Sequence, residues 1–242
     1  MGSVELFEED VGAAYFAAFS TRLGGVSEGD FESLNLGILT DDEPDRVVEN
    51  RRILAGAAGV DPEVATMAWQ VHGARVFEAD GRGIVKPGTD FEQGDGLWTE
   101  TPGRAVGLLT ADCYPVVLAR QNGKPRLVVL HVGWRGLLEG ILDNGVAAAG
   151  GPLAAAIGPG IGPCCYEVGD EVAAPFKARF GDDVMHGRNL DLAKAIERGL
   201  RAAGVESVGR TGHCTSCEPE LFFSHRRDRG RTGRQGVLAF IR

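Results

Sequence analysis

The sequence contains no long apolar run and no excess of positive charge, and both absences exclude classes of protein. No stretch approaches the roughly 18 apolar residues that indicate a membrane-spanning helix, so we expect no membrane partner. Residues 1–5 lack the basic and apolar regions of a secretory signal, which predicts a cytoplasmic protein. The formal net charge of −9 disfavours nucleic acid as a partner, because proteins that bind the phosphate backbone usually carry a basic face.

Cysteine is scarce, and its pattern does not indicate a disulfide framework. The cysteines occupy positions 113, 164, 165, 214 and 217. In a cytoplasmic protein they are better interpreted as thiols. Cys214 and Cys217 form a C-x-x-C pair, but adjacent cysteines such as Cys164 and Cys165 rarely both bind one tetrahedral ion. A structural zinc site made of these four cysteines is therefore not expected.

The pattern of apolar residues predicts an ordinary globular protein that contains both helices and strands. The 242 residues are enough to bury a full core, and no repeat or linker interrupts them, so we expect one domain over residues 1–242. Helical periodicity is found in residues 44–58, 137–149, 170–180 and 191–203. Strands are expected at residues 15–19, 67–69, 74–79, 106–109, 127–130, 153–157 and 237–241, and residues 94–99 are expected to form a turn that enters another strand.

Three potential metal ligands follow or end strand-like apolar runs. His72 closes the first run, Cys113 follows residues 106–109, and His131 ends the run that begins at residue 127. Zinc takes cysteine and histidine together, and a catalytic zinc site has three protein ligands and one open position. The sequence therefore favours an open zinc site made of these three residues. Taken singly, each has a structural interpretation as a buried histidine or a small buried cysteine.

Two further features concern the chemistry near these residues. Cys113 and His131 could instead be the nucleophile and base of a cysteine hydrolase, because a Cys/His pair has the same residue types as two metal ligands. Arg135 lies at the start of a predicted helix, where its guanidinium and backbone N–H groups could hold an anion. A basic run at residues 225–234 could also serve an anionic substrate, or be a solvated loop.

A set of short motifs is spread along nearly the whole chain. They are Phe19-Ser20-Thr21-Arg22, Ser33-Leu34-Asn35-Leu36-Gly37, Trp69-Gln70-Val71-His72, Gly94-Asp95-Gly96, Thr110-Ala111-Asp112-Cys113, His131-Val132-Gly133-Trp134-Arg135, Gly162-Pro163-Cys164-Cys165-Tyr166-Glu167 and Phe222-Phe223-Ser224-His225-Arg226-Arg227. Together they resemble the motifs of the YfiH-like family, also known as laccase-domain or "polyphenol oxidase" proteins and described as purine nucleoside phosphorylases. His225 and Val132 depart from the family, in which tyrosine and alanine are usual at these positions.

The resemblance implies an α+β fold, a four-layer α/β/β/α sandwich with mixed sheets. It implies zinc held by His72, Cys113 and His131, and phosphorolysis of adenosine, inosine, guanosine and methylthioadenosine, with adenosine deamination. The small-molecule partners would be a nucleoside and inorganic phosphate. Asp112 is a candidate proton carrier or a supporting carboxylate, and Arg135 a candidate phosphate ligand.

Further residues would line the substrate pocket if the resemblance extends to the contacts. They are Arg22, Asn35, Arg135, Cys164, Tyr166 and Glu167. Two alternatives from the family remain open at this point, an enzyme that acts on peptidoglycan precursors and a copper-dependent polyphenol oxidase. Coupled copper sites need many histidines, and the five in this chain do not easily supply them.

Overall fold

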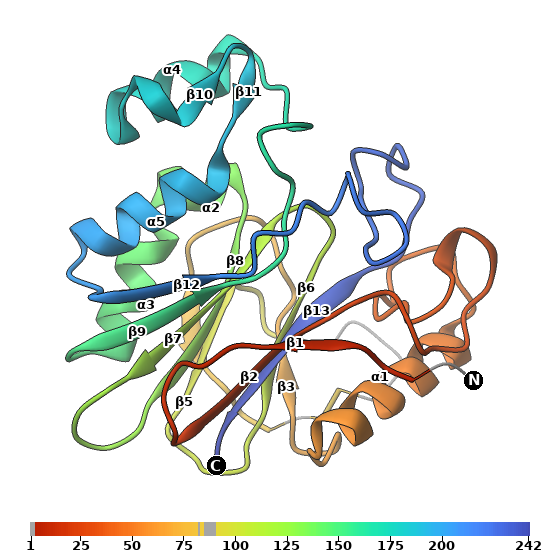
Figure 1. Cartoon of the computed structure of the whole chain (residues 1–242). Helices are drawn as coiled ribbons and strands as arrows, with labels where there is room; N and C mark the ends of the chain where they lie inside the picture. Colours follow the sequence, from red (N-terminus) through yellow and green to blue (C-terminus); the bar gives the residue numbers. More distant parts are fainter. Residues whose placement is uncertain (1–2, 82, 85–90) are drawn as a thin grey trace.

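Two mixed β-sheets stack at the centre of the fold (Figure 1). The structure, a computed structural model, describes residues 3–81, 83–84 and 91–242. The first sheet has the strand order β1 (Leu6–Glu8), β2 (Tyr15–Ser20), β13 (Gln235–Ile241), β6 (Val106–Thr110) and β3 (Thr66–Met67). The second has the order β12 (Ser207–Arg210), β9 (Leu153–Ile157), β7 (Tyr114–Arg120), β8 (Leu127–Val132), β5 (Gly96–Thr99) and β4 (Val76–Glu78).

Helices cover the outer faces of both sheets. They are α1 (Pro44–Ala58), α2 (Trp134–Glu139), α3 (Ile141–Ala149), α4 (Asp170–Phe180) and α5 (Leu192–Ala202), with short 3-10 turns at Gly29–Phe31 and Asp182–Val184 and a hairpin of β10 (Met185–His186) and β11 (Asn189–Leu190). In Figure 1, α1 lies on one side of the stacked sheets and α3 and α5 lie on the other. Within the described residues, no helix combines the length and the apolar character needed to cross a bilayer.

Side chains alternate along the strands and so separate three cores. On β8, Leu127 and Val129 point into the core between the sheets, whereas Val128 and Leu130 point to the helices outside the second sheet. The opposite outer core packs α1 against the first sheet, with Leu54 among its members. This succession of helices, sheet, sheet and helices confirms the predicted four-layer α/β/β/α fold.

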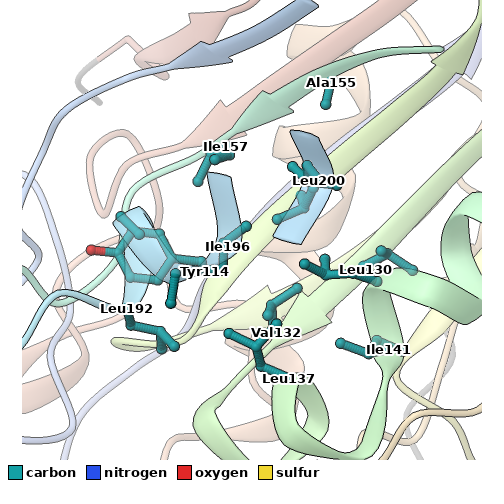
Figure 2. Close-up of a cluster of buried hydrophobic side chains, with 14 of the residues drawn as sticks. Tyr114, Leu130, Val132, Leu137, Ile141, Ala155, Ile157, Leu192, Ile196 and Leu200 are labelled. Carbon is teal, nitrogen blue, oxygen red and sulfur yellow. The ribbon is translucent and has the colours of Figure 1, made fainter. Parts of the chain in front are cut away.

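The core beneath α2 to α5 is the largest of the three and fixes the strand ends near the candidate site. Figure 2 shows Leu192, Ile196 and Leu200 of α5 beside Ile157 and Leu130 of the second sheet. Tyr114, at the start of β7, is buried in this core, and its hydroxyl donates to the carbonyl of Ile161 at 2.9 Å. The loop after β9 is thereby tied to the beginning of β7. Burial of this kind stabilises by about 25 cal/mol per Å² of apolar surface.

The predicted helix over residues 137–149 is wrong as a single helix. Gly140 adopts a left-handed backbone with φ of 95° and ends α2, and α3 begins at the next residue. Helical periodicity continues across the break because both helices bury their apolar faces in the same core. No strand was predicted at β7, a central strand of the second sheet that contains Pro115, a residue that is unusual inside a sheet.

Candidate metal centre and substrate pocket

The three predicted metal ligands lie where the chain meets both sheets. β6 ends at Thr110 in the first sheet and β7 begins at Tyr114 in the second, so Cys113 lies in a short crossing between them. His72 lies in the longer crossing from β3 to β4. His131 is the penultimate residue of β8 and shares the side of that strand that faces the core between the sheets. The two crossings bring these residues together, although 59 positions separate the first from the last.

The side chains of His72, Cys113 and His131 form a compact group. One nitrogen of each imidazole and the sulfur of Cys113 all lie within 4.8 Å of one another. The two imidazole rings meet edge to face, with centroids 4.8 Å apart. Zinc bonds of about 2.0–2.3 Å would place such atoms about 3.3–3.8 Å apart, which lies within this limit. His131 is buried and His72 is exposed, which leaves one side of the group open.

Asp95 supports two of the three candidate ligands from a fully buried position. Its Oδ1 lies 2.8 Å from Nδ1 of His131 and accepts a hydrogen bond of 2.9 Å from the backbone N–H of His72. Its Oδ2 accepts from the N–H groups of Val71 and Gly73. A carboxylate on Nδ1 leaves Nε2 of His131 as the metal-binding nitrogen. Asp95 lies in the motif Gly94-Asp95-Gly96, whose residue types alone do not indicate this role.

Two non-glycine residues at the site have a left-handed backbone. His72 has φ of 61° and Asp112 has φ of 89°. Such conformations cost about 1–3 kcal/mol each and are concentrated at functional sites. Asp95 holds the first through the backbone N–H of His72. The carbonyl of Asp112 accepts from the N–H of Ile161, which holds the second. The surrounding hydrogen bonds therefore fix the backbone on both sides of the candidate ligands.

Cys113 and His131 each stabilise the charged form of the other. Burial alone would raise the pKa of the Cys113 thiol, but the positive charge of His131 and hydrogen bonds from both histidines lower it to about 6. Burial alone would lower the pKa of His131, but the Cys113 thiolate and Asp95 raise it to about 9. Burial would likewise raise the pKa of Asp95, and the bond to His131 and the neighbouring N–H groups hold it below its ordinary value. A thiolate is the form that binds metal, and also the form that acts as a nucleophile.

A cavity of about 530 Å³ opens directly onto the three candidate ligands. Trp69, Phe91 and Tyr166 give it aromatic walls, and Arg226 and Arg234 give it positive charge. Pockets of roughly 300–1,000 Å³ with apolar walls and a few polar groups are typical binding sites for small molecules. The lining combines flat apolar surfaces with guanidinium groups, so it can accept a ligand that contains both an aromatic ring and an anion.

Of the predicted substrate contacts, Tyr166 alone is among the described residues that line this cavity. Arg135 is exposed, and its guanidinium lies 5.0 Å from the ring centroid of Trp134 rather than in the cavity wall. The guanidinium of Arg22 donates to the carbonyls of Glu32 and Pro219.

The remaining predicted contacts also lie outside the cavity lining that the structure describes, and each contacts other groups. The buried amide of Asn35 donates to Thr40 and Asp42. Glu167 pairs with Arg188, and Cys164 lies beside other cysteines. The sequence motifs do not distinguish residues that shape the loops from residues that face the cavity, because both kinds occur in the same turns.

Asp112 lies in the cavity wall beside Cys113, but both of its carboxylate oxygens accept hydrogen bonds. The hydroxyl of Thr215 donates to Oδ1 at 2.7 Å, and the backbone N–H of Arg226 donates to Oδ2 at 2.7 Å. Of the two interpretations of Asp112, these contacts favour the supporting carboxylate over the proton carrier. Asp112 joins the crossing between the sheets to the loop that carries Arg226.

The donor set fits a single zinc ion. Two imidazoles and one thiolate supply three ligands, the carboxylate of Asp95 orients one imidazole, and the cavity leaves the fourth position accessible. A coupled copper centre would need more imidazoles than the two that gather here. Of the remaining histidines, His186 lies near Asp191 and His213 pairs with Glu218, while His225 lines the cavity.

Comparisons with known proteins agree on one family. A model of the family described as "Multi-copper polyphenol oxidoreductase laccase" matches residues 16–242. A purine nucleoside phosphorylase of Deinococcus radiodurans is 42% identical over 231 residues, which cover 91% of this chain and 87% of that protein. The purine nucleoside phosphorylase YfiH of Escherichia coli is 38% identical over 234 residues, with 93% of each chain covered.

Solved structures give the same result. The crystal structure of YlmD from Geobacillus stearothermophilus superposes with a TM-score of 0.87 at 35% identity, covering 95% of this chain and 93% of that one. A Neisseria meningitidis protein superposes with a TM-score of 0.86 at 32% identity, covering 98% of each chain. Sequence and fold thus agree over nearly the whole length, and the chain belongs to the laccase-domain, YfiH-like family, whose relatives named here are purine nucleoside phosphorylases.

Proposed function

We propose that this protein is a zinc-dependent purine nucleoside phosphorylase that cleaves adenosine, and also inosine, guanosine and methylthioadenosine. The observation that carries the proposal is that the His72, Cys113 and His131 group opens onto a cavity with aromatic and cationic walls. Relatives named purine nucleoside phosphorylase, at 38% and 42% identity, support the reaction class. An open metal position in the same cavity also supports adenosine deamination as a second activity.

Phosphorolysis joins a phosphate oxygen to C1′ of the ribose and breaks the bond from C1′ to N9 of the purine. The electron pair of that bond leaves with the base, which takes up a proton, and ribose 1-phosphate is formed. Trp69 and Phe91 offer apolar faces on which a purine can pack. Arg226 and Arg234 can hold the phosphate, since guanidinium groups bind phosphate oxygens in pairs of parallel hydrogen bonds.

The other polar groups of the cavity have supporting roles in this proposal. Zinc bound by His72, Cys113 and His131 would supply Lewis-acid stabilisation of charge on an oxygen in the cavity. Asp112 positions the loop of Arg226 through the hydrogen bonds described above. His225 lines the same cavity and can deliver the proton to the departing base.

Product analysis tests the proposed reaction. Zinc-loaded protein incubated with adenosine and inorganic phosphate is expected to form adenine and ribose 1-phosphate in equal amounts, measured by chromatography. Without phosphate, adenine should not form, and inosine formed under these conditions would show the deaminase activity. Adenine released without phosphate, or no product from any of the four nucleosides, would contradict phosphorolysis.

Two single variants test whether Arg226 or Arg135 binds the phosphate. We expect Arg226→Ala to lower phosphate-dependent kcat/KM about 10- to 100-fold, because a hydrogen bond to a charged group contributes about 1.5–3 kcal/mol. The backbone N–H that holds Asp112 is retained in this variant. Arg135→Ala is the matched control, since its guanidinium lies outside the described lining, and should leave the rate within about twofold. A large loss in Arg135→Ala with little change in Arg226→Ala would instead identify Arg135 as the phosphate ligand.

Two other activities are each favoured by one observation. The lowered pKa of Cys113 beside His131 suits a cysteine hydrolase, for which peptidoglycan-precursor amides or esters would be the substrates. The matching family model is described as a multi-copper polyphenol oxidoreductase, which favours a copper oxidase. A covalent acyl-enzyme on Cys113 would support the first, and oxygen uptake with a phenol that depends on added copper would support the second.

A further inference from the structure

Four cysteines outside the candidate metal centre meet in one cluster. Cys164 and Cys165 follow β9, and Cys214 and Cys217 follow β12, about 50 positions later. Their four sulfur atoms lie within 4.8 Å of one another. These are all the cysteines of the chain except Cys113, and the proposed reaction uses none of them.

The sheet explains how such distant residues meet. β9 and β12 are parallel neighbours, with Ile157 opposite Arg210 at their ends, so the loops that follow leave the same edge of the sheet. A parallel bridge between Gly160 and Cys214 extends this pairing beyond the strands. The chain then turns at Gly162, whose carbonyl accepts hydrogen bonds from the N–H groups of Cys165 and Tyr166. This turn places both Cys164 and Cys165 toward the loop that follows β12.

The spacing of the sulfur atoms fits a metal better than disulfides. Cys164 lies 3.4 Å from Cys214 and 3.2 Å from Cys217, and Cys165 lies 3.3 Å from Cys217. A disulfide needs about 2.05 Å, whereas four sulfurs at about 2.3 Å from zinc are about 3.8 Å apart. The Cys164 sulfur lies close to two others, which suits one ion bound by all four sulfurs better than two separate disulfides. The N–H of Gly162 donates to the Cys214 sulfur at 3.2 Å, as expected for a stabilised thiolate.

We propose that Cys164, Cys165, Cys214 and Cys217 bind a second zinc ion, which fastens together the two loops that form one wall of the substrate cavity. Four thiolates without an open position make a structural rather than catalytic site. The first loop continues from Cys165 to Tyr166 in the cavity wall. The second continues from Cys214 to Thr215, which donates to Asp112 beside Cys113. The two loops also meet through Arg226, which donates to the carbonyl of Glu167.

Metal analysis of the whole protein tests this site independently of activity. Protein equilibrated with zinc under reducing conditions is expected to hold two zinc ions per chain, by elemental analysis and native mass spectrometry. The double variant Cys164→Ser/Cys217→Ser should hold one, and retention of that ion at the His72 site would show that the variant is folded. Ser216→Ala, between Cys214 and Cys217, keeps all four thiols and should hold two. With cobalt in place of zinc, thiolate charge-transfer absorption should fall several-fold in the double variant.

Thiol labelling of the unaltered protein provides a second measurement. Cys164 and Cys217 are exposed, so alkylating reagents should reach them unless metal masks them. We expect zinc to protect all four cysteines and a chelator to release them for labelling. One zinc ion per wild-type chain with four reactive thiols would overturn the assignment. So would two zinc ions retained by the double variant, disulfides among the four cysteines that persist under reducing conditions, or iron bound in place of zinc.

Discussion

Replacing Cys113 by alanine is expected to remove one zinc ion per chain and to abolish most of the nucleoside cleavage. The same result is expected for His131→Ala and, to a smaller degree, for the more exposed His72→Ala. Two remaining ligands bind zinc much more weakly than three, and the loss of several kcal/mol of charge stabilisation corresponds to about a thousandfold decrease in kcat/KM. Zinc content and product formation, measured on the same preparations, check the expected loss of zinc and the expected loss of cleavage.

His186→Ala is the matched control for the ligand variants. His186 is an exposed histidine on β10 whose Nε2 lies 3.8 Å from a carboxylate oxygen of Asp191, so its loss should change neither zinc content nor rate. Labelling distinguishes ligand from nucleophile, since zinc should protect Cys113 from alkylation and chelation should expose it. Full zinc content in all three ligand variants would refute the site, and rapid labelling of zinc-loaded Cys113 would favour the hydrolase.

Asp95→Asn is expected to weaken zinc binding at this site about 10- to 100-fold, the usual effect of losing a carboxylate behind a metal-binding histidine. The carboxylate of Asp95 lies against Nδ1 of His131 and accepts from three backbone N–H groups, including that of His72. An amide of the same shape replaces one acceptor oxygen by a donor group, which then faces other donors. The orientation of His131 and the strained backbone of His72 should both relax.

Competition titration with a chromophoric chelator measures this affinity without reference to catalysis. Asp143→Asn is the control, because Asp143 is an exposed carboxylate on α3 that pairs with Arg179. Its zinc affinity should equal that of the wild type. If Asp95→Asn also bound zinc with unchanged affinity, the hydrogen bonds of Asp95 would be purely structural and the proposed support of the metal ligands would be wrong. A lower melting temperature for the Asp95 variant is expected in either case, because buried donors lose their acceptor.

Local chemistry in the sequence was enough to predict many of the elements. Helix α1 was predicted with its observed bounds, because Pro44 suits a first turn and Gly59 adopts the left-handed backbone that ends the helix. The break at Gly140 was missed, since helical periodicity does not reveal where a backbone changes direction. β7 was not predicted, although its segment is largely apolar; it contains Pro115, and proline is unusual inside a sheet.

The sequence by itself determined which residues could bind a metal, since histidine and cysteine at the ends of apolar runs are readily recognised. Only the tertiary structure decided which of them meet. Two crossings between the sheets place His72 and Cys113 beside His131, and Asp95 becomes their support because β5 pairs with β8. Parallel pairing of β9 and β12 likewise gathers four cysteines whose spacing had argued against a shared site. The physical reason is that strand pairing joins segments far apart in the chain, and sequence periodicity carries information only about a residue's near neighbours.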